Sequence, residues 1–136
     1  MGVRYLIDTH ALLWLVGSPS RLPAALLAEL AAPSTALAAS AATAMELATK
    51  IRLGKLPEAA SLGREEGWRE ALGRIGASGE DLTPGQCLAA GSLAWAHRDP
   101  FDRLLAAQAI DLGLVLVTKD PAFATAPGLT TKWSPT

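Results

Sequence analysis

Three aspartates stand where a folded chain could bring carboxylates together. Asp8 directly follows the apolar residues 3–7, Asp120 comes just after the apolar residues 114–117, and Asp102 opens the alanine- and leucine-rich segment before that second run. Clustered carboxylates raise one another's pKa, so a cluster that stays ionised needs cations. Ligand sets made only of oxygen suit Mg²⁺ or Mn²⁺. Such ions activate water and stabilise the leaving oxygen in phosphodiester cleavage. The pattern therefore indicates a metal-dependent hydrolase.

Helix capping is the alternative explanation for the same acids. Asp99 followed by Pro100 is typical of a helix start. Asp102 would then lie in the first helical turn, where a negative charge favours the helix dipole. Asp8, or Thr9 beside it, could cap a short helix after the first strand. The residues alone leave both roles open.

Glu46 is a fourth candidate, because it is the only carboxylate between Glu29 and Glu58. It precedes Lys50 by one helical turn, so an ordinary surface ion pair worth about 0.2–0.5 kcal/mol is the alternative role. Lys50 and Lys55 gather at the end of the same predicted helix. There they could complement the helix dipole or contact a phosphate backbone.

Strands and helices alternate along the chain, which predicts an α/β fold with a central, mostly parallel sheet flanked by helices. We expect strands at residues 3–7, 35–39, 114–117 and 130–133, an edge segment at 80–83, a break at 76–79, and helices at 12–16, 23–32, 40–53, 58–75, 84–96 and 99–112. Parallel strands present their carboxyl ends, where ligands bind, at one edge of the sheet. Asp8 and Asp120 should therefore be neighbours at that edge. Asp102 can join them if an irregular connection at residues 97–99 starts its helix there.

Length and composition set the limits of this interpretation. A chain of 136 residues, half of them hydrophobic, fits one domain spanning residues 1–136. A net charge of −1 gives no basic field that would indicate nucleic-acid binding. This weakens a pure binding role, although not that of an enzyme that holds phosphates through metal ions. His10, Cys87 and His97 are too scattered for a zinc site, and one cysteine cannot form an internal disulfide. With no convincing signal peptide or membrane span, we expect a cytoplasmic protein with no membrane partner.

Six blocks of sequence together resemble the PIN-domain ribonucleases, and specifically the VapC-type toxins of bacterial toxin–antitoxin pairs. The blocks are YLIDTHALLW (residues 5–14), SAATAMELA (40–48), LGKL (53–56), HRDPFDR (97–103), LLAAQA (104–109) and LVTKDPAF (116–123). They occur in the family's order over nearly the whole chain, which makes the combined resemblance strong.

This resemblance implies an α/β PIN domain that cleaves RNA with Mg²⁺ or Mn²⁺. It implies that the catalytic, metal-binding acids are Asp8, Glu46, Asp102 and Asp120, with Asp99, Thr118 and Thr9 beside them. It also implies a homodimer that is neutralised by a VapB-type antitoxin inserted into the active-site groove. The chain departs from similar sequences at Met45, where a tryptophan often precedes the glutamate. That difference concerns packing and leaves the four acids intact.

Two other functions compete with the nuclease. Asp8-Thr9 and Thr118-Lys119-Asp120 faintly resemble phosphoaspartyl hydrolases and receiver domains, but His10 stands where the hydrolases want an aspartate. A non-catalytic PIN-like scaffold should have lost acids, and none of the four is missing. Direct RNA contacts are predicted less specifically: the candidates are Arg98, Arg103, Lys50 and Lys55.

Overall fold

A five-stranded, all-parallel sheet forms the centre of the computed structural model, which describes residues 3–134. The strand order is β3-β2-β1-β4-β5. The strands are β1 (Arg4–Ile7), β2 (Ala36–Ser40), β3 (Ala77–Glu80), β4 (Val115–Val117) and β5 (Thr131–Lys132). The α-helices are α1 (Thr9–Gly17), α2 (Ala24–Ala31), α3 (Ala41–Arg52), α4 (Glu65–Ile75), α5 (Pro84–Ser92) and α6 (Pro100–Leu112). Short 3₁₀ helices are η1 (Pro19–Arg21), η2 (Pro57–Gly63) and η3 (Pro121–Thr125).

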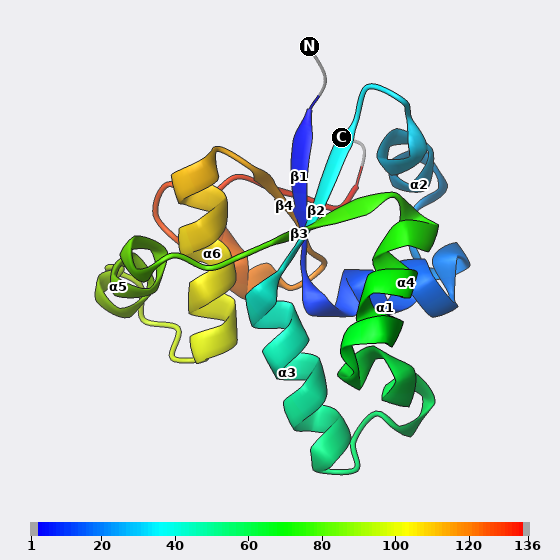
Figure 1. Cartoon of the computed structure of the whole chain (residues 1–136). Helices are drawn as coiled ribbons and strands as arrows, with labels where there is room; N and C mark the ends of the chain where they lie inside the picture. The colour runs from blue at the N-terminus through cyan, green and yellow to red at the C-terminus, as the bar shows by residue number, and fades with distance from the viewer. Residues whose placement is uncertain (1–2, 135–136) are drawn as a thin grey trace.

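Helices cover both faces of the sheet (Figure 1). Tyr5 and Ile7 of β1 pack on one face with residues of α1, α2 and α4. Leu6, between them in sequence, packs on the other face with residues of α6. Successive side chains of a strand point to opposite faces, so a strand covered on both sides must be apolar throughout. This arrangement explains the uninterrupted apolar run before Asp8 and confirms the predicted fold class.

The sheet places the carboxyl ends of its three central strands, β2, β1 and β4, side by side. β1 pairs with β2 and with β4, and Ile7 lies opposite both Ala39 and Val117. The chain therefore enters α1 from β1, α3 from β2 and η3 from β4 at one edge of the sheet. Residues that follow these three strands are brought together although they are far apart in sequence.

The predicted elements differ from the observed ones at three places. Residues 76–79 were expected to be a break, but residues 77–80 form β3, a polar strand that pairs with β2 alone. An edge strand held mainly by its backbone hydrogen bonds gives no apolar pattern. Residues 58–75 contain the separate helices η2 and α4. The helix expected at 84–96 ends at Ser92, because the side chain of Arg103 binds the carbonyls that follow. Across residues 3–134 there is no helix of the length and apolarity needed to span a membrane.

Candidate active site

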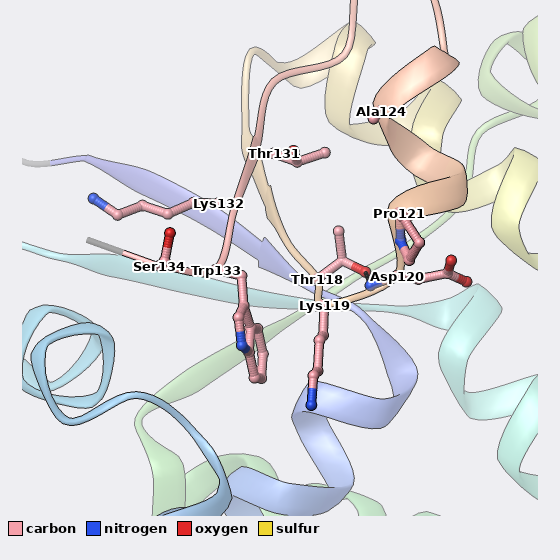
Figure 2. A pocket seen from close by; sticks show the side chains of 9 residues that line it. All are labelled: Thr118, Lys119, Asp120, Pro121, Ala124, Thr131, Lys132, Trp133 and Ser134. Carbon is pink, nitrogen blue, oxygen red and sulfur yellow. Dashed lines mark hydrogen bonds between the residues drawn. The ribbon is translucent and has the colours of Figure 1, made fainter. Parts of the chain in front are cut away.

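Asp8 and Asp120 follow the neighbouring strands β1 and β4. Thr118 lies beside Asp120 (Figure 2). The backbone N–H of Asp8 donates to the carbonyl of Val117 at 3.0 Å, which extends the pairing of the two strands. The hydroxyl of Thr118 accepts from the backbone N–H of Asp120 at 3.0 Å and donates to the carboxylate of Asp8. Thr118 thus fixes the two acids relative to each other.

Both aspartates also cap the helix that follows them. An Asp8 carboxylate oxygen accepts from the N–H of Ala11 at 2.8 Å, and Asp120 accepts from Ala122 at 2.9 Å. Asp8 is nevertheless only 5% exposed, far more buried than a cap requires. Capping uses one oxygen of each carboxylate and leaves the other for a ligand. The two roles that the sequence left open are therefore compatible.

Glu46 projects from α3, whose first turn is capped by the hydroxyl of Ser40 at the end of β2. The Glu46 carboxylate accepts hydrogen bonds from Thr9 at 2.5 Å and from the ammonium of Lys50 at 2.8 Å. The predicted pair between Glu46 and Lys50 does exist, but Glu46 is only 6% exposed. The surface ion pair considered from the sequence is therefore wrong as an explanation of this residue.

Asp99 and Asp102 begin α6, and the irregular connection before this helix is held by Arg103. Asp99 accepts from the backbone N–H groups of Phe101 and Asp102 at 2.9 and 3.1 Å, as the capping role predicted. The guanidinium of Arg103 donates to the carbonyls of Ala90, Gly91, Leu93, Trp95 and His97. All five of its N–H donors are used in this way. The structure thus gives Arg103 a structural role and does not support the predicted RNA contact.

His97 fixes the carboxylate of Asp102. Its Nε2 lies 2.7 Å from Oδ2 of Asp102, and its ring packs on Trp95 with the centroids 4.7 Å apart. Trp95 is anchored in turn by a hydrogen bond from its indole N–H to Thr125 at 2.9 Å. The sequence pattern did not single out His97 for this role. Its position five residues before Asp102, across a helix cap, was the available signal.

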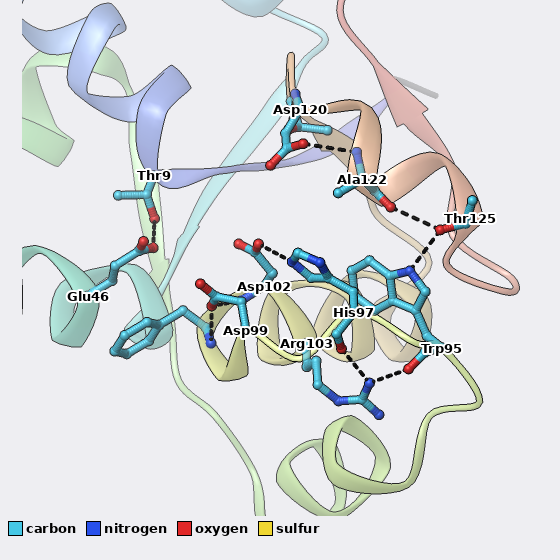
Figure 3. Close-up of polar contacts among 12 residues, drawn as sticks. Thr9, Glu46, Trp95, His97, Asp99, Asp102, Arg103, Asp120, Ala122 and Thr125 are labelled. Carbon is cyan, nitrogen blue, oxygen red and sulfur yellow. Dashed lines mark hydrogen bonds and ion pairs between the residues drawn. The ribbon is translucent and has the colours of Figure 1, made fainter.

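All the predicted acids line one pocket of about 170 Å³, which we call the acid pocket. Its lining residues are Asp8, Thr9, His10, Glu46, Lys50, Asp99, Asp102, Asp120 and Phe123. Figure 3 shows the carboxylates of Glu46, Asp99 and Asp102 directed toward a common space, with Asp120 across from them. Within residues 3–134, no three of these side chains converge closely enough to form a complete metal-coordination site. Each carboxylate is instead occupied by a neighbouring donor from the protein.

Burial and mutual repulsion raise the pKa of two of these acids. The pKa of Asp8 is raised chiefly by burial and further by Asp120, against the lowering effects of Thr118, Ala11 and His10. The pKa of Asp102 is raised chiefly by burial, with Asp99 and Glu46 adding to it and His97 opposing it. Both ionised carboxylates are therefore held at a free-energy cost that a bound cation would relieve.

The donor set of the acid pocket fits a hard divalent cation. Its possible ligands are carboxylate and hydroxyl oxygens and the imidazole of His10, and it contains no thiol. The ammonium of Lys50 already lies against Glu46 and shows that this carboxylate accepts positive charge. Lys50 is thus at the site, whereas Arg98 and Lys55 are exposed residues of the connections before α6 and after α3.

Comparison with known proteins places this geometry in a family. The family model described as PIN domain matches residues 5–129. The fold is similar to a structure of VapBC2 from Rickettsia felis bound to a DNA fragment from their promoter, at 20% identity, 97% and 100% coverage of the two chains and a TM-score of 0.71. It is also similar to DNA-bound VapBC from Salmonella typhimurium, at 19% identity, 96% and 97% coverage and a TM-score of 0.67. A third similar structure is VapBC-1 from nontypeable Haemophilus influenzae, at 19% identity, 96% and 97% coverage of the two chains and a TM-score of 0.63. No curated protein sequence matches significantly.

Proposed function

The chain belongs to the PIN domain family, and we propose that it is a metal-dependent endoribonuclease, the VapC-type toxin of a VapBC-type toxin–antitoxin pair. The single observation that carries the proposal is the convergence of Asp8, Glu46, Asp102 and Asp120 from four separate segments on one small pocket. Helix capping alone does not require that acids from separate segments line the same pocket. Asp8 and Glu46 are buried and Asp102 is partly buried, and like charges removed from water are retained where a cation or a reaction uses them.

The four acids Asp8, Glu46, Asp102 and Asp120 would hold Mg²⁺ or Mn²⁺. When bound, such an ion activates water and stabilises the leaving oxygen of a phosphodiester. Neighbouring side chains, one of them in the lining of the pocket, prepare the acids for this task. Thr118 and Thr9 hydrogen-bond Asp8 and Glu46, and thereby orient them.

Two further contacts, made by His97 and Lys50, affect the orientation and charge of the acids. His97 holds Asp102 through Nε2, which keeps one carboxylate oxygen directed and leaves the other free. Lys50 balances the charge of Glu46 in the metal-free protein. Once that charge is balanced by an ion, the ammonium is available to a phosphate of the RNA at the rim of the pocket. Asp99, at the helix start, lines the same pocket and adds negative charge beside Asp102.

The structural neighbours support an antitoxin as a partner of this chain. Three of them are VapBC complexes, two of which are bound to DNA. We propose that this chain likewise pairs with a VapB-type antitoxin, forms a homodimer and acts on RNA in the cytoplasm. The receiver-like alternative loses its basis, because the strand order β3-β2-β1-β4-β5 differs from the 2-1-3-4-5 order of the receiver fold. A non-catalytic scaffold role would not explain why the four acids line one pocket.

Cleavage of RNA by the purified chain, freed of any antitoxin, tests the proposal. Pooled cellular RNA is incubated with Mg²⁺, with Mn²⁺ and with EDTA, and the ends of the products are mapped. We expect metal-dependent cleavage that is lost in an Asp8→Asn, Asp102→Asn double variant and retained in Glu66→Gln, an exposed acid of α4. Cleavage that persists in the double variant, or that resists EDTA, would refute the proposed site.

A further inference from the structure

A second and larger pocket adjoins the acid pocket. It has a volume of about 400 Å³ and is lined by Asp8, His10, Ala11, Trp14, Lys119, Asp120 and Pro121. Asp8, His10 and Asp120 are shared with the acid pocket, so the two hollows have a common wall. The remaining wall is formed by an indole, a proline ring, a methyl group and one lysine. We call this hollow the Trp14 pocket.

Cations and aromatic rings surround Trp14. Nζ of Lys119 lies 5.7 Å from the centroid of the indole, and Cζ of Arg21 lies 4.7 Å from it. Trp133 meets the same ring edge-on, with the centroids 5.8 Å apart. Figure 2 shows Lys119 and Trp133 side by side, both extending toward α1, while Asp120 points away from them. Trp14 is only partly buried, so it is more than a member of the core.

The two lysines near this region differ in their availability. Lys132 lies 2.8 Å from a carboxylate oxygen of Glu29 and is therefore already paired. In the described part of the chain, Lys119 takes part in no salt bridge. Its contact with Trp14 is long for a cation–π pair, at the limit of about 6 Å where the attraction fades. Lys119 is thus an exposed cation, one residue from Asp120, that an anionic ligand could engage.

We propose that the Trp14 pocket binds the nucleotide adjacent to the scissile phosphate, with its base against Trp14 and its outer phosphate at Lys119. This proposal rests on the proposed nuclease function. The acid pocket is less than half as large and is lined almost wholly by polar groups, so it suits a phosphate and ions rather than a base. A strand with its scissile phosphate among the acids must place a neighbouring nucleotide in an adjoining hollow. Aromatic walls beside a cation are what binding sites for single-stranded RNA use.

Binding of a fluorescently labelled, mixed-sequence oligoribonucleotide tests this subsite. The parent for the test is Asp102→Asn, because this substitution blocks cleavage under the proposed function and Asp102 does not line the Trp14 pocket. Trp14→Leu, Trp14→Phe and Lys119→Met are compared with it over a range of salt concentrations. The matched controls are Trp68→Phe and Arg64→Met, both in the region of α4 and outside the two pockets. Circular dichroism establishes that each variant is folded.

We expect Trp14→Leu to weaken RNA binding about fivefold or more, the loss of one stacked base. Trp14→Phe, which keeps an aromatic face, should bind within about twofold of the parent. Lys119→Met should reduce the slope of log K against log salt by about 0.7, the loss of one phosphate contact to a single strand. Both controls should match the parent in affinity and in slope.

The subsite would be overturned if Trp14→Leu and Lys119→Met both bound RNA with the parent's affinity and the parent's salt dependence. It would also be overturned if the parent bound no RNA. If Trp14→Leu does not fold, the salt slope of Lys119→Met decides alone, since an exposed lysine can be replaced without loss of the core. Loss of antitoxin binding in the variants with RNA binding intact would mean that a protein occupies the pocket. Metal-dependent cleavage by the native chain is followed in parallel. Metal-dependent cleavage by the native chain would support the nuclease function even if the subsite proposal were refuted.

Discussion

At the scale of single residues, Asp8 has a structural role in addition to the proposed role in metal binding. It caps α1 through Ala11, yet it is buried and its pKa is raised. A cap alone could be an asparagine, which is as good an N-cap as aspartate. Under the proposed function the metal site requires the charge of Asp8, and we expect the metal-free fold to be more stable without that charge.

Replacing Asp8 by asparagine should stabilise the metal-free protein while abolishing its activity. Folding raises the pKa of Asp8, so between the unfolded-state pKa and the folded-state pKa the native state binds more protons than the unfolded state. The contribution of Asp8 to the free energy of unfolding therefore falls as pH rises through that window. At pH 7 the free energy of unfolding of Asp8→Asn should exceed that of the native chain, and the gap should close as pH falls below the raised pKa. Urea titrations at several pH values measure it. A native chain that is more stable than Asp8→Asn at pH 7 would contradict the assignment.

Metal affinity should depend on pH for the same reason. The pKa values of Asp8 and Asp102 are both raised, and an ion binds their ionised forms. Affinity for Mn²⁺ should therefore weaken as pH falls, and should begin to do so above the range of an ordinary aspartate, which titrates near pKa 3.9. Calorimetric titrations across the acid range measure this. Affinity that stays constant until the ordinary aspartate range would show that neither acid is a ligand.

At the scale of elements, Arg103 shapes the connection that delivers Asp102. Its guanidinium binds the carbonyls between α5 and α6 and so defines the path of residues 93–97. The sequence indicates a helix start at Asp99-Pro100 and allows an irregular connection at residues 97–99, whereas residues 93–96 were predicted to be helical. It does not reveal that an arginine four residues further on holds that connection, because no periodicity encodes which carbonyls a side chain will meet.

Arg103→Met should lower the free energy of unfolding by about 2–3 kcal/mol, since several carbonyls lose a charged donor. Arg103→Lys should recover little of this loss, because an ammonium cannot reproduce the planar fork. Affinity for Mn²⁺ should also fall, as Asp102 loses its fixed approach, whereas the salt dependence of RNA binding should not change. Thermal unfolding, calorimetry and RNA titration measure the three effects. A reduced salt slope with unchanged stability would restore the role in RNA binding.

At the scale of the whole molecule, the parallel sheet explains why so much of the site could be predicted. Once β1 and β4 are recognised as buried parallel strands, Asp8 and Asp120 must lie at one edge. Glu46 and Asp102 required the family resemblance, because their helices could have started at many angles to that edge. The contact of Thr9 with Glu46 could not be predicted from the sequence, since it depends on how α1 packs against α3. The contact of His97 with Asp102 is local, and the spacing of five residues was its available signal. The polar edge strand β3 was missed because it buries too little to leave a pattern.

Binding of Mn²⁺, followed by electron paramagnetic resonance, tests most directly the claim that the pooled acids form a metal centre. The single variants Asp8→Asn, Glu46→Gln, Asp102→Asn and Asp120→Asn are compared with the native chain and with the exposed control Glu66→Gln. We predict that each of the four weakens Mn²⁺ binding by more than about 100-fold, which exceeds the loss caused by residues that only support a ligand. Glu66→Gln should bind as the native chain does. Native affinity in all four variants would contradict the account.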